Sequence, residues 1–443
     1  MSQLTTDKIQ EFAEALESRE SYVASQHAVT INGINAASEN NALSLTNTSV
    51  FSHEIQTVSI SDQKRSGRCW LFAALNVVRH QIANEYKMDD LMLSQSYLYF
   101  WDKLEKSNTF LEKIVASAND PLEDRWVTQL MTNPQAEGGW WEYAASLIKK
   151  YGVVPISAMP EAVATTHSTQ LNTLIDRILR QAALSLREQV GKKAPSTEIE
   201  RIKNTALADV YRVLTIAIGT PPKEFSFSYK DKDKKYHRDD KLTPQAFFKK
   251  YSKMNLDDYI TLVNDPTPGR AFNAPYVLKD GENMVGGMDV VMFNVEVDSL
   301  VDLTSKQIKK SEPVWIGLEV QEKVNKKGYM ALDVYDYEST FNIDFMNDKA
   351  QRLLSRDASV SHAMTIVGVD LVKNKPRQWK VENSWGDKPG NKGYYTMSTG
   401  WFKQNGYMVV IRKDLLSETQ HKALAKKPIE IPYWDHLNAM RAE

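Results

Sequence analysis

The sequence predicts an α+β protein with a mainly helical first half and a last third that is rich in strands. Two patterns lead to this fold class. Apolar residues recur at three- and four-residue spacings through the N-terminal half, whereas a two-residue alternation begins at Val290. The two patterns are segregated along the chain, which favours an α+β fold over a repeating βαβ fold.

The helical half begins with an amphipathic segment in which Ile9, Phe12 and Leu16 fall on one face. Residues 69–78 contain few polar side chains and no helix breaker, so a buried helix is expected to begin at Cys69. Further helices are expected at 93–101, 108–118 and 140–151 and over much of 168–218.

Strands are expected in six stretches of the last third: 290–295, 314–320, 363–369, 379–382, 393–397 and 408–411. Residues 230–235 mix charges of both signs and predict a solvated turn or face. Residues 386–393 are rich in glycine, but they lack phosphate-loop spacing and precede a strand, so a turn is expected there.

Composition excludes several classes of function. The chain has 443 residues, 55 Lys and Arg, 56 Asp and Glu, and a net charge near −1, which gives no support for nucleic-acid or anionic-membrane binding. Its single cysteine excludes an intrachain disulfide and a cysteine-rich metal site, and it fits a reducing compartment. No signal-peptide pattern and no apolar run of about 18 residues occurs, so a cytoplasmic protein is expected. No metal or cofactor is expected.

Cys69 lies at the expected start of a helix, directly after Ser66-Gly67-Arg68. A helix N-terminus lowers the pKa of a thiol through its dipole and its unpaired N–H groups, and a nearby imidazolium lowers it further. The position therefore suits a nucleophile. A buried structural cysteine beside Trp70 and Phe72 would give the same local pattern.

A thiol nucleophile needs a histidine partner, and His362 is the candidate because it opens the strongly apolar strand at 363–369. A structural core histidine would also fit this pattern. Asn383 follows the strand at 379–382 and could fix the imidazole tautomer by accepting its N–H. Trp385 could cover that hydrogen bond and exclude water.

The order of Cys69, His362 and Asn383 resembles the papain family of cysteine peptidases. Gln63 matches that family's oxyanion-hole glutamine, whose side-chain amide would donate together with the backbone N–H of Cys69. The pair Gly138-Gly139 resembles the glycines that pair with the substrate main chain in that family. The gap between the cysteine and the histidine exceeds the ordinary papain spacing by roughly 150 residues.

The longer layout resembles the bleomycin hydrolase/aminopeptidase C family in particular. The segments that resemble it are 63–76, 93–95, 100–103, 151–155, 219–231, 243–248 and 382–387. The resemblance implies a papain-like fold with large helical insertions, assembled as a homohexamer with active sites facing an enclosed channel. It also implies peptide substrates and an aminopeptidase activity, because the C-terminal arm lies in the cleft and its terminal carboxylate, here on Glu443, holds the substrate α-amino group.

We therefore expect one papain-like peptidase unit over residues 1–443. Its expected parts are an N-terminal arm and helical half (1–160) with Cys69, a mainly helical insertion for oligomerisation or accessory roles (161–260), a β-rich half (261–430) with His362 and Asn383, and a C-terminal arm (431–443).

The C-terminal arm departs from the family pattern. His436-Leu437-Asn438 stands where the family has Pro-Met-Gly, and the tail is longer by one or two residues. A displaced terminal carboxylate would favour an endopeptidase or oligopeptidase on the same scaffold. Two further alternatives are a Cys–His amidase or acyl transferase, and an inert peptide-binding protein; the intact set of Gln63, Cys69, His362 and Asn383 argues against the last.

Overall fold

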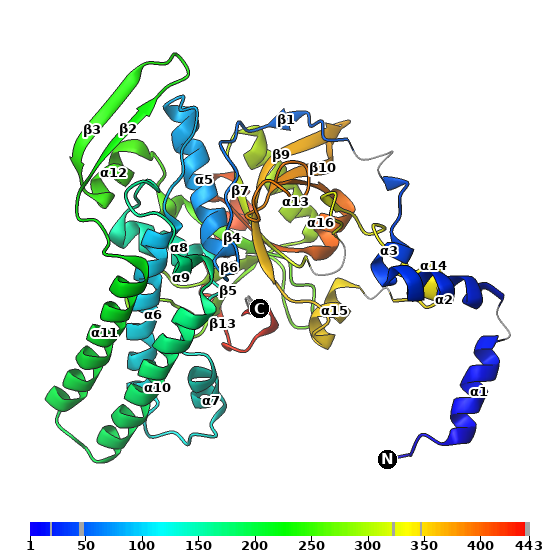
Figure 1. Ribbon diagram of the computed structural model, residues 1–443, viewed down its shortest axis with the longest axis horizontal. Helices are drawn as coiled ribbons and strands as arrows, with labels where there is room; N and C mark the ends of the chain where they lie inside the picture. The colour runs from blue at the N-terminus through cyan, green and yellow to red at the C-terminus, as the bar shows by residue number, and fades with distance from the viewer. Residues whose placement is uncertain (18–19, 44–47, 321–323, 346–347, 439–443) are drawn as a thin grey trace.

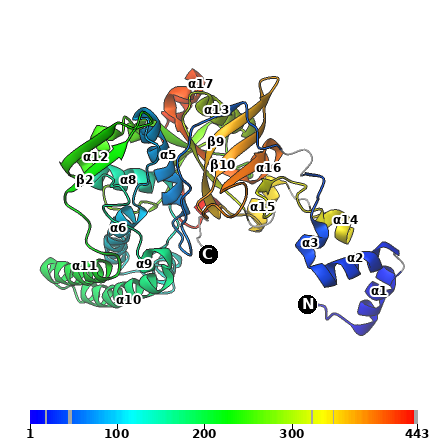
Figure 2. The same ribbon diagram turned by 45° about the horizontal axis from the view of Figure 1, so that its top comes forward.

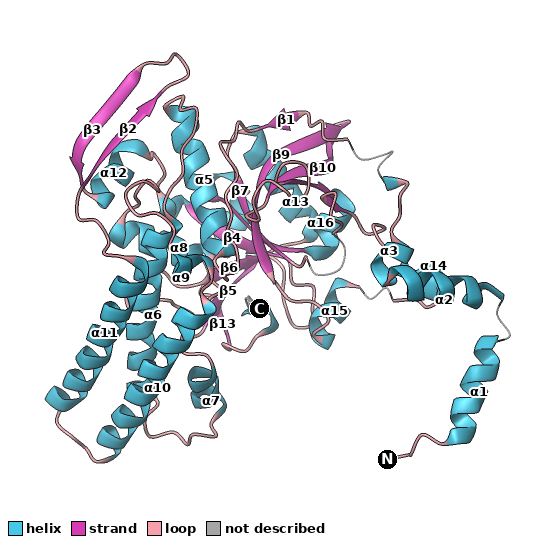
Figure 3. Cartoon of the chain, in the orientation of Figure 1, coloured by secondary structure: helices cyan, strands magenta, loops and turns pink. Residues whose placement is uncertain are grey.

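Helices and strands are segregated in space as they are in the sequence (Figures 1 and 3). The computed structural model describes the chain except for residues 18–19, 44–47, 321–323, 346–347 and 439–443. A helical half lies against a half built on one large sheet, and β13 near the C-terminus lies between them (Figure 1). The predicted α+β class is confirmed.

The helical half is built on α5 (Cys69–Glu85), α6 (Gln95–Ala116) and α8 (Trp141–Tyr151). The helices predicted at 93–101 and 108–118 form the single helix α6, because no glycine or proline interrupts the stretch between them. Ser94 caps this helix, its Oγ accepting the backbone N–H of Tyr97 at 3.1 Å.

The predicted insertion contains a long helix pair followed by a β-hairpin. Helices α10 (Thr169–Gly191) and α11 (Ser196–Ile218) lie side by side and pack on α6. Strands β2 (Phe225–Lys230) and β3 (Tyr236–Leu242) form the hairpin, with the predicted charged turn at its tip, and α12 (Pro244–Tyr251) follows. The hairpin therefore adds a small second sheet to a mainly helical segment.

The large sheet has eleven strands in the order β13-β5-β6-β4-β12-β7-β9-β10-β11-β8, with β1 beside β9. Strands β9 and β10 are an antiparallel pair in which Glu382 faces Thr365, so the end of β10 returns to the start of β9. The strand bounds are β1 (His53–Glu54), β4 (Tyr259–Val263), β5 (Ala274–Leu278), β6 (Val291–Asn294), β7 (Val314–Leu318), β8 (Tyr329–Met330), β9 (His362–Val372), β10 (Lys375–Glu382), β11 (Tyr394–Ser398), β12 (Gly406–Arg412) and β13 (Ile429–Ile431).

Alternate side chains of the central strands enter two cores. Trp315 and Ala363 point towards α5 and the helical half, whereas Ile316 and Met364 pack with α13 (Val297–Lys309) and α16 (Thr399–Asn405) on the other face. Helix α5 therefore forms the face of the helical half that contacts the sheet (Figures 1 and 2).

Most of the remaining helices lie towards the outside of this body. Helices α1 to α3 project away from it (Figures 1 and 2). The bounds are α1 (Thr6–Glu17), α2 (Glu20–Asn32), α3 (Ile34–Ser38), α7 (Arg125–Thr132), α9 (Val163–Thr166), α14 (Tyr337–Phe341), α15 (Lys349–Ser355) and α17 (Glu418–Leu424).

Candidate active site

Cys69 is the first residue of α5, and it is buried at 8% exposure. The turn that leads into it is anchored by two carboxylates. The Arg68 guanidinium donates to both oxygens of Glu161, at 3.1 and 2.8 Å, and the backbone N–H of Gly67 donates to Glu137 Oε2 at 2.9 Å. These bonds fix the position of the thiol at the helix N-terminus.

His362 and Asn383 meet where the antiparallel strands β9 and β10 close on each other. His362 is the first residue of β9, Asn383 follows β10, and His362 Nε2 lies 2.8 Å from Asn383 Oδ1. The same oxygen accepts the backbone N–H of Ser384 at 2.8 Å, so Oδ1 is an acceptor. Nε2 must then carry the proton, which leaves Nδ1 of the neutral imidazole as its basic nitrogen.

Trp385 lies against the ring of His362. The two ring centroids are 4.8 Å apart at an angle of 33°, and Trp385 remains 40% exposed at the surface while His362 is 4% exposed. The indole therefore covers the imidazole on the solvent side. Trp385 is expected from the sequence to cover the hydrogen bond between His362 and Asn383 in this way.

The thiol and the imidazole occupy the same buried site, since the backbone N–H of Ala363 reaches Cys69. Burial raises the pKa of Cys69 to about 11, against backbone hydrogen bonds from Ala363, Trp70 and Cys69 itself. Burial also lowers the pKa of His362 to about 4, against the hydrogen bond with Asn383. Each charge is disfavoured alone, but proton transfer from thiol to imidazole creates both together without changing the net charge.

Gln63 is held with its amide in one orientation. Its Oε1 accepts from Ser384 Oγ at 2.6 Å, and its Nε2 donates to the carbonyl of Ser66 at 2.8 Å. The backbone N–H of Gln63 also donates to the carbonyl of Ser384 at 2.8 Å. No other described residue accepts from Nε2, so its second hydrogen is available as a donor, which is the group that an oxyanion needs.

The glycine pair lies in the loop before α8, beside the residue that follows the cysteine. A Cβ on Gly139 would lie 2.5 Å from the ring of Trp70, so the close contact requires glycine. Trp70 Nε1 donates to the carbonyl of Glu137 at 2.8 Å. Burial alone would raise the pKa of Glu137, but the charge of Lys103 and three side-chain hydrogen bonds bring it down to about 2. The carboxylate that anchors the cysteine turn is therefore ionised.

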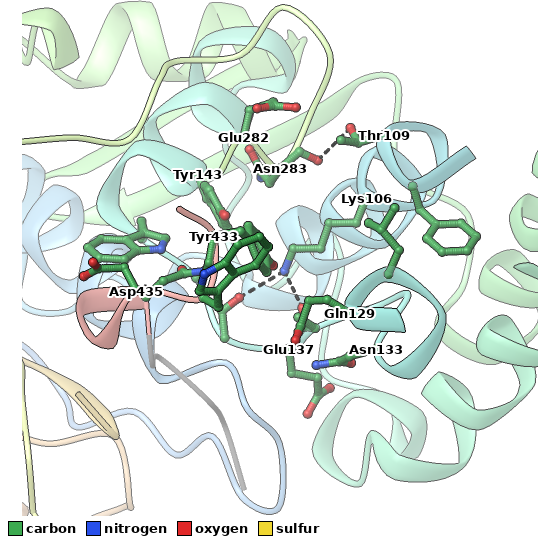
Figure 4. A pocket seen from close by; sticks show the side chains of 18 of the residues that line it. Lys106, Thr109, Gln129, Asn133, Glu137, Tyr143, Glu282, Asn283, Tyr433 and Asp435 are labelled. Carbon is green, nitrogen blue, oxygen red and sulfur yellow. Dashed lines mark hydrogen bonds between the residues drawn. The ribbon is translucent and has the colours of Figure 1, made fainter. Parts of the chain in front are cut away.

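A cavity of about 380 Å³ adjoins the glycine pair and is partly closed by the C-terminal arm (Figure 4). Its walls combine aromatic and polar groups, among them Tyr143 from α8 and Tyr433 from the arm. Glu443, predicted to bind the substrate α-amino group, lies outside the described residues.

The arm is docked by polar side chains that are mostly buried. It leaves β13, which pairs in parallel with β5. Asp435 binds Arg270, and His436 Nε2 lies 2.9 Å from Asp265 Oδ2. Leu437 is 1% exposed. Of the substituted tail residues, His436 and Leu437 are thus part of the packing between the arm and the body.

Sequence reasoning missed a buried ionic group that joins the two halves. Glu382, next to Asn383, binds Arg79 Nη2 at 2.7 Å and His80 Nε2 at 2.5 Å, and all three side chains are fully buried. Burial lowers the pKa of His80, so Nε2–H of the neutral ring donates to Glu382 while Nδ1 accepts the N–H of Val58 at 3.4 Å. Adjacent polar residues inside the apolar helix were the only signal in the sequence.

The described residues contain no cluster of three or more His, Cys, Asp or Glu side chains arranged to hold a metal ion. None of the described helices is long and apolar enough to cross a membrane.

Comparison with known proteins places the chain in a family. Residues 3–438 match the Peptidase C1-like family. The chain belongs to this family. It is 40% identical to "Aminopeptidase C" of Lactobacillus delbrueckii subsp. lactis over 99% of this chain and 98% of that protein, and 38% identical to "Aminopeptidase C" of Streptococcus thermophilus over the full length of both.

The fold agrees with this family assignment. A crystal structure described as pepw from Lactobacillus rhamnosis HN001 (DR20) superposes with a TM-score of 0.97, at 42% identity and 99% coverage of both chains. The predicted resemblance to the bleomycin hydrolase/aminopeptidase C family and the papain-like fold are confirmed.

Proposed function

We propose that this family member is a cysteine aminopeptidase in which Cys69 is the nucleophile, His362 the acid–base group and Asn383 the residue that orients it. The observation that carries the proposal is the bond from His362 Nε2 to Asn383, which leaves Nδ1 as the basic nitrogen in the buried site that holds the thiol. The names of the full-length relatives, "Aminopeptidase C", support the class of reaction.

The reaction begins when Nδ1 of His362 takes the proton of Cys69 and the thiolate attacks the scissile carbonyl carbon. The carbonyl oxygen becomes an oxyanion that accepts from Gln63 Nε2 and the backbone N–H of Cys69. The imidazolium then gives its proton to the leaving amine as the C–N bond breaks, which produces a thioester. In the second half His362 takes a proton from water, the hydroxide displaces the thiolate, and the acid is released.

Aminopeptidase activity is favoured over endopeptidase activity because residues of the arm form one wall of the cavity beside the glycine pair. A substrate that enters from that side is limited in length by the arm. The test is hydrolysis of one fluorogenic peptide with a free and with an acetylated N-terminus. Cleavage of the free form alone supports an aminopeptidase, and comparable cleavage of both forms would show that the alternative, an endopeptidase, is correct.

The role of Cys69 is tested with a Cys69→Ala variant and with iodoacetamide. Both are expected to abolish hydrolysis, while circular dichroism shows that the variant remains folded. Turnover by the folded Cys69→Ala protein would contradict the mechanism. Transfer of the acyl group to an added amine in preference to water would instead indicate an acyl transferase.

We also propose that the protein assembles as a homohexamer in the cytoplasm. Helix α1 projects from the body with Ile9, Phe12 and Leu16 exposed, which supports burial against another copy. Native mass spectrometry measures the number of copies, and a monomer would contradict the assembly. The single free cysteine fits a reducing compartment; recovery of the protein outside the cytoplasmic fraction would contradict the location.

A further inference from the structure

Lys106 is a buried lysine that the proposed mechanism does not use. It lies on α6, its side chain is only 9% exposed, and its Nζ pairs with the buried Asp102 at 2.9 Å. The ammonium also lies 5.3 Å from the ring centroid of Trp70 and 5.6 Å from that of Tyr143. A buried ammonium destabilises a fold unless its hydrogen bonds are satisfied, so the acceptors of this lysine indicate what it holds.

Those acceptors are backbone carbonyls of the loop that ends in the glycine pair. Lys106 Nζ donates to the carbonyl of Ala136 at 2.7 Å and to that of Gly138 at 3.2 Å (Figure 4). The intervening carbonyl of Glu137 accepts from Trp70 Nε1 instead. Three successive carbonyls thus point in alternating directions, the first and third towards Lys106 on α6 and the second towards Trp70 on α5, as in an extended strand.

Gly139 continues this strip along the wall of the cavity. No hydrogen bond within the described part of the chain uses its backbone N–H or carbonyl. The strip is therefore fixed by its first three residues, while the main-chain groups of the next residue remain available to a ligand. An extended peptide is the ligand class that such an edge binds.

We propose that Lys106 is a positioning residue that keeps the loop 136–139 extended so that its main chain can pair with a peptide substrate. This inference rests on the proposed peptidase function. Lys106 acts through the loop and not on the reacting atoms. Its loss therefore weakens peptide binding and turnover, whereas the reaction of Cys69 with a small alkylator, which does not need the strip, is unchanged.

The test compares Lys106→Met, Lys106→Arg and the double variant D102N/K106M, which avoids leaving the carboxylate of Asp102 buried without its cation. Lys203→Met is the matched control, because Lys203 has an 8% exposed side chain and its ion pair with Glu112 joins α11 to α6. Three quantities are measured for each variant. These are kcat/KM for a fluorogenic peptide, the rate of Cys69 alkylation by iodoacetamide, and the Kd of the uncleaved peptide in a Cys69→Ala background.

Loss of Lys106 is expected to lower kcat/KM by about 10- to 100-fold and to weaken peptide binding, with alkylation within about twofold of wild type. Lys106→Arg is expected to recover part of the loss, since it can still donate to carbonyls. Unchanged kinetics and binding, a parallel fall in alkylation, or an equal loss in Lys203→Met would overturn the proposal. Wild-type hydrolysis that survives complete alkylation would instead overturn the proposed function, and the binding comparison would still decide the role of Lys106.

Discussion

Removal of His362 should change how the reactivity of Cys69 depends on pH. If the proposed proton transfer to His362 creates an ion pair in the wild type, the thiol is already ionised and the alkylation rate should be nearly flat between pH 5 and 8. In His362→Ala the thiolate has no counter-charge. Burial raises the pKa of Cys69 to about 11, so at pH 7 only about one thiol in 10⁴ is ionised. Far below the pKa, that fraction rises tenfold per pH unit.

The assay is the second-order rate constant for iodoacetamide, measured by mass spectrometry from pH 5 to pH 8. Cys69 is the only cysteine, so a single adduct reports a single site. We expect the rate to change by less than about threefold in the wild type and by about 1000-fold in the variant. His421→Ala, an exposed position on α17, is the control. A wild-type rate that also rises tenfold per pH unit would refute the ion pair.

Three further predictions concern stability and the glycine loop. Glu142 is fully buried and burial raises its pKa to about 7, so its protonated form stabilises the fold at low pH, and this contribution is lost as the pH rises through about 7. The free energy of unfolding of Glu142→Gln, measured with urea, should therefore rise by about 2 to 3 kcal/mol relative to wild type between pH 5 and pH 8. A difference that stays constant over this range would contradict the prediction. Glu382→Gln leaves Arg79 buried without a counter-charge and should lower the free energy of unfolding by about 3 to 5 kcal/mol at pH 7, whereas a loss below about 1 kcal/mol would contradict a buried ion pair. The added methyl group of Gly139→Ala must displace the ring of Trp70, so this variant should lower kcat/KM for peptides by at least about tenfold. Wild-type kinetics in the variant would contradict this, because they would show that the loop shifts without loss of function.

Residue order and local pattern were enough to predict the placement of the candidate catalytic residues. Cys69 begins a helix and His362 begins an apolar strand, and both features are local. The glycine pair was recognisable from the family resemblance and from its place directly before the expected helix at 140–151. Helix α13 was not predicted because it lies within a region where the two-residue alternation predicted strands. Leu300 and Val301 lie on its buried face. Strand β4 has only five residues, which is too short for its period to be read.

The contacts that support the site could not be predicted, because they join residues far apart in the sequence. His80 has no local pattern that marks it as buried, yet it is fully buried against Glu382 from the other half of the protein. Lys106 belongs to a charged helical segment that would suit a solvent-exposed face equally well. Such groups become recognisable only when the fold brings their partners together.

The hydrogen bonds between Glu382 and α5, the helix that begins with Cys69, affect how much the segment connecting the two halves can vary in length. They fix the position of Asn383 relative to α5 across the contact between the halves, so the number of residues that connect them along the chain does not set the distance between nucleophile and base. A long helix pair and a hairpin occupy that connection. A cut in the exposed turn between α10 and α11 would accordingly leave two fragments that still share one reaction centre.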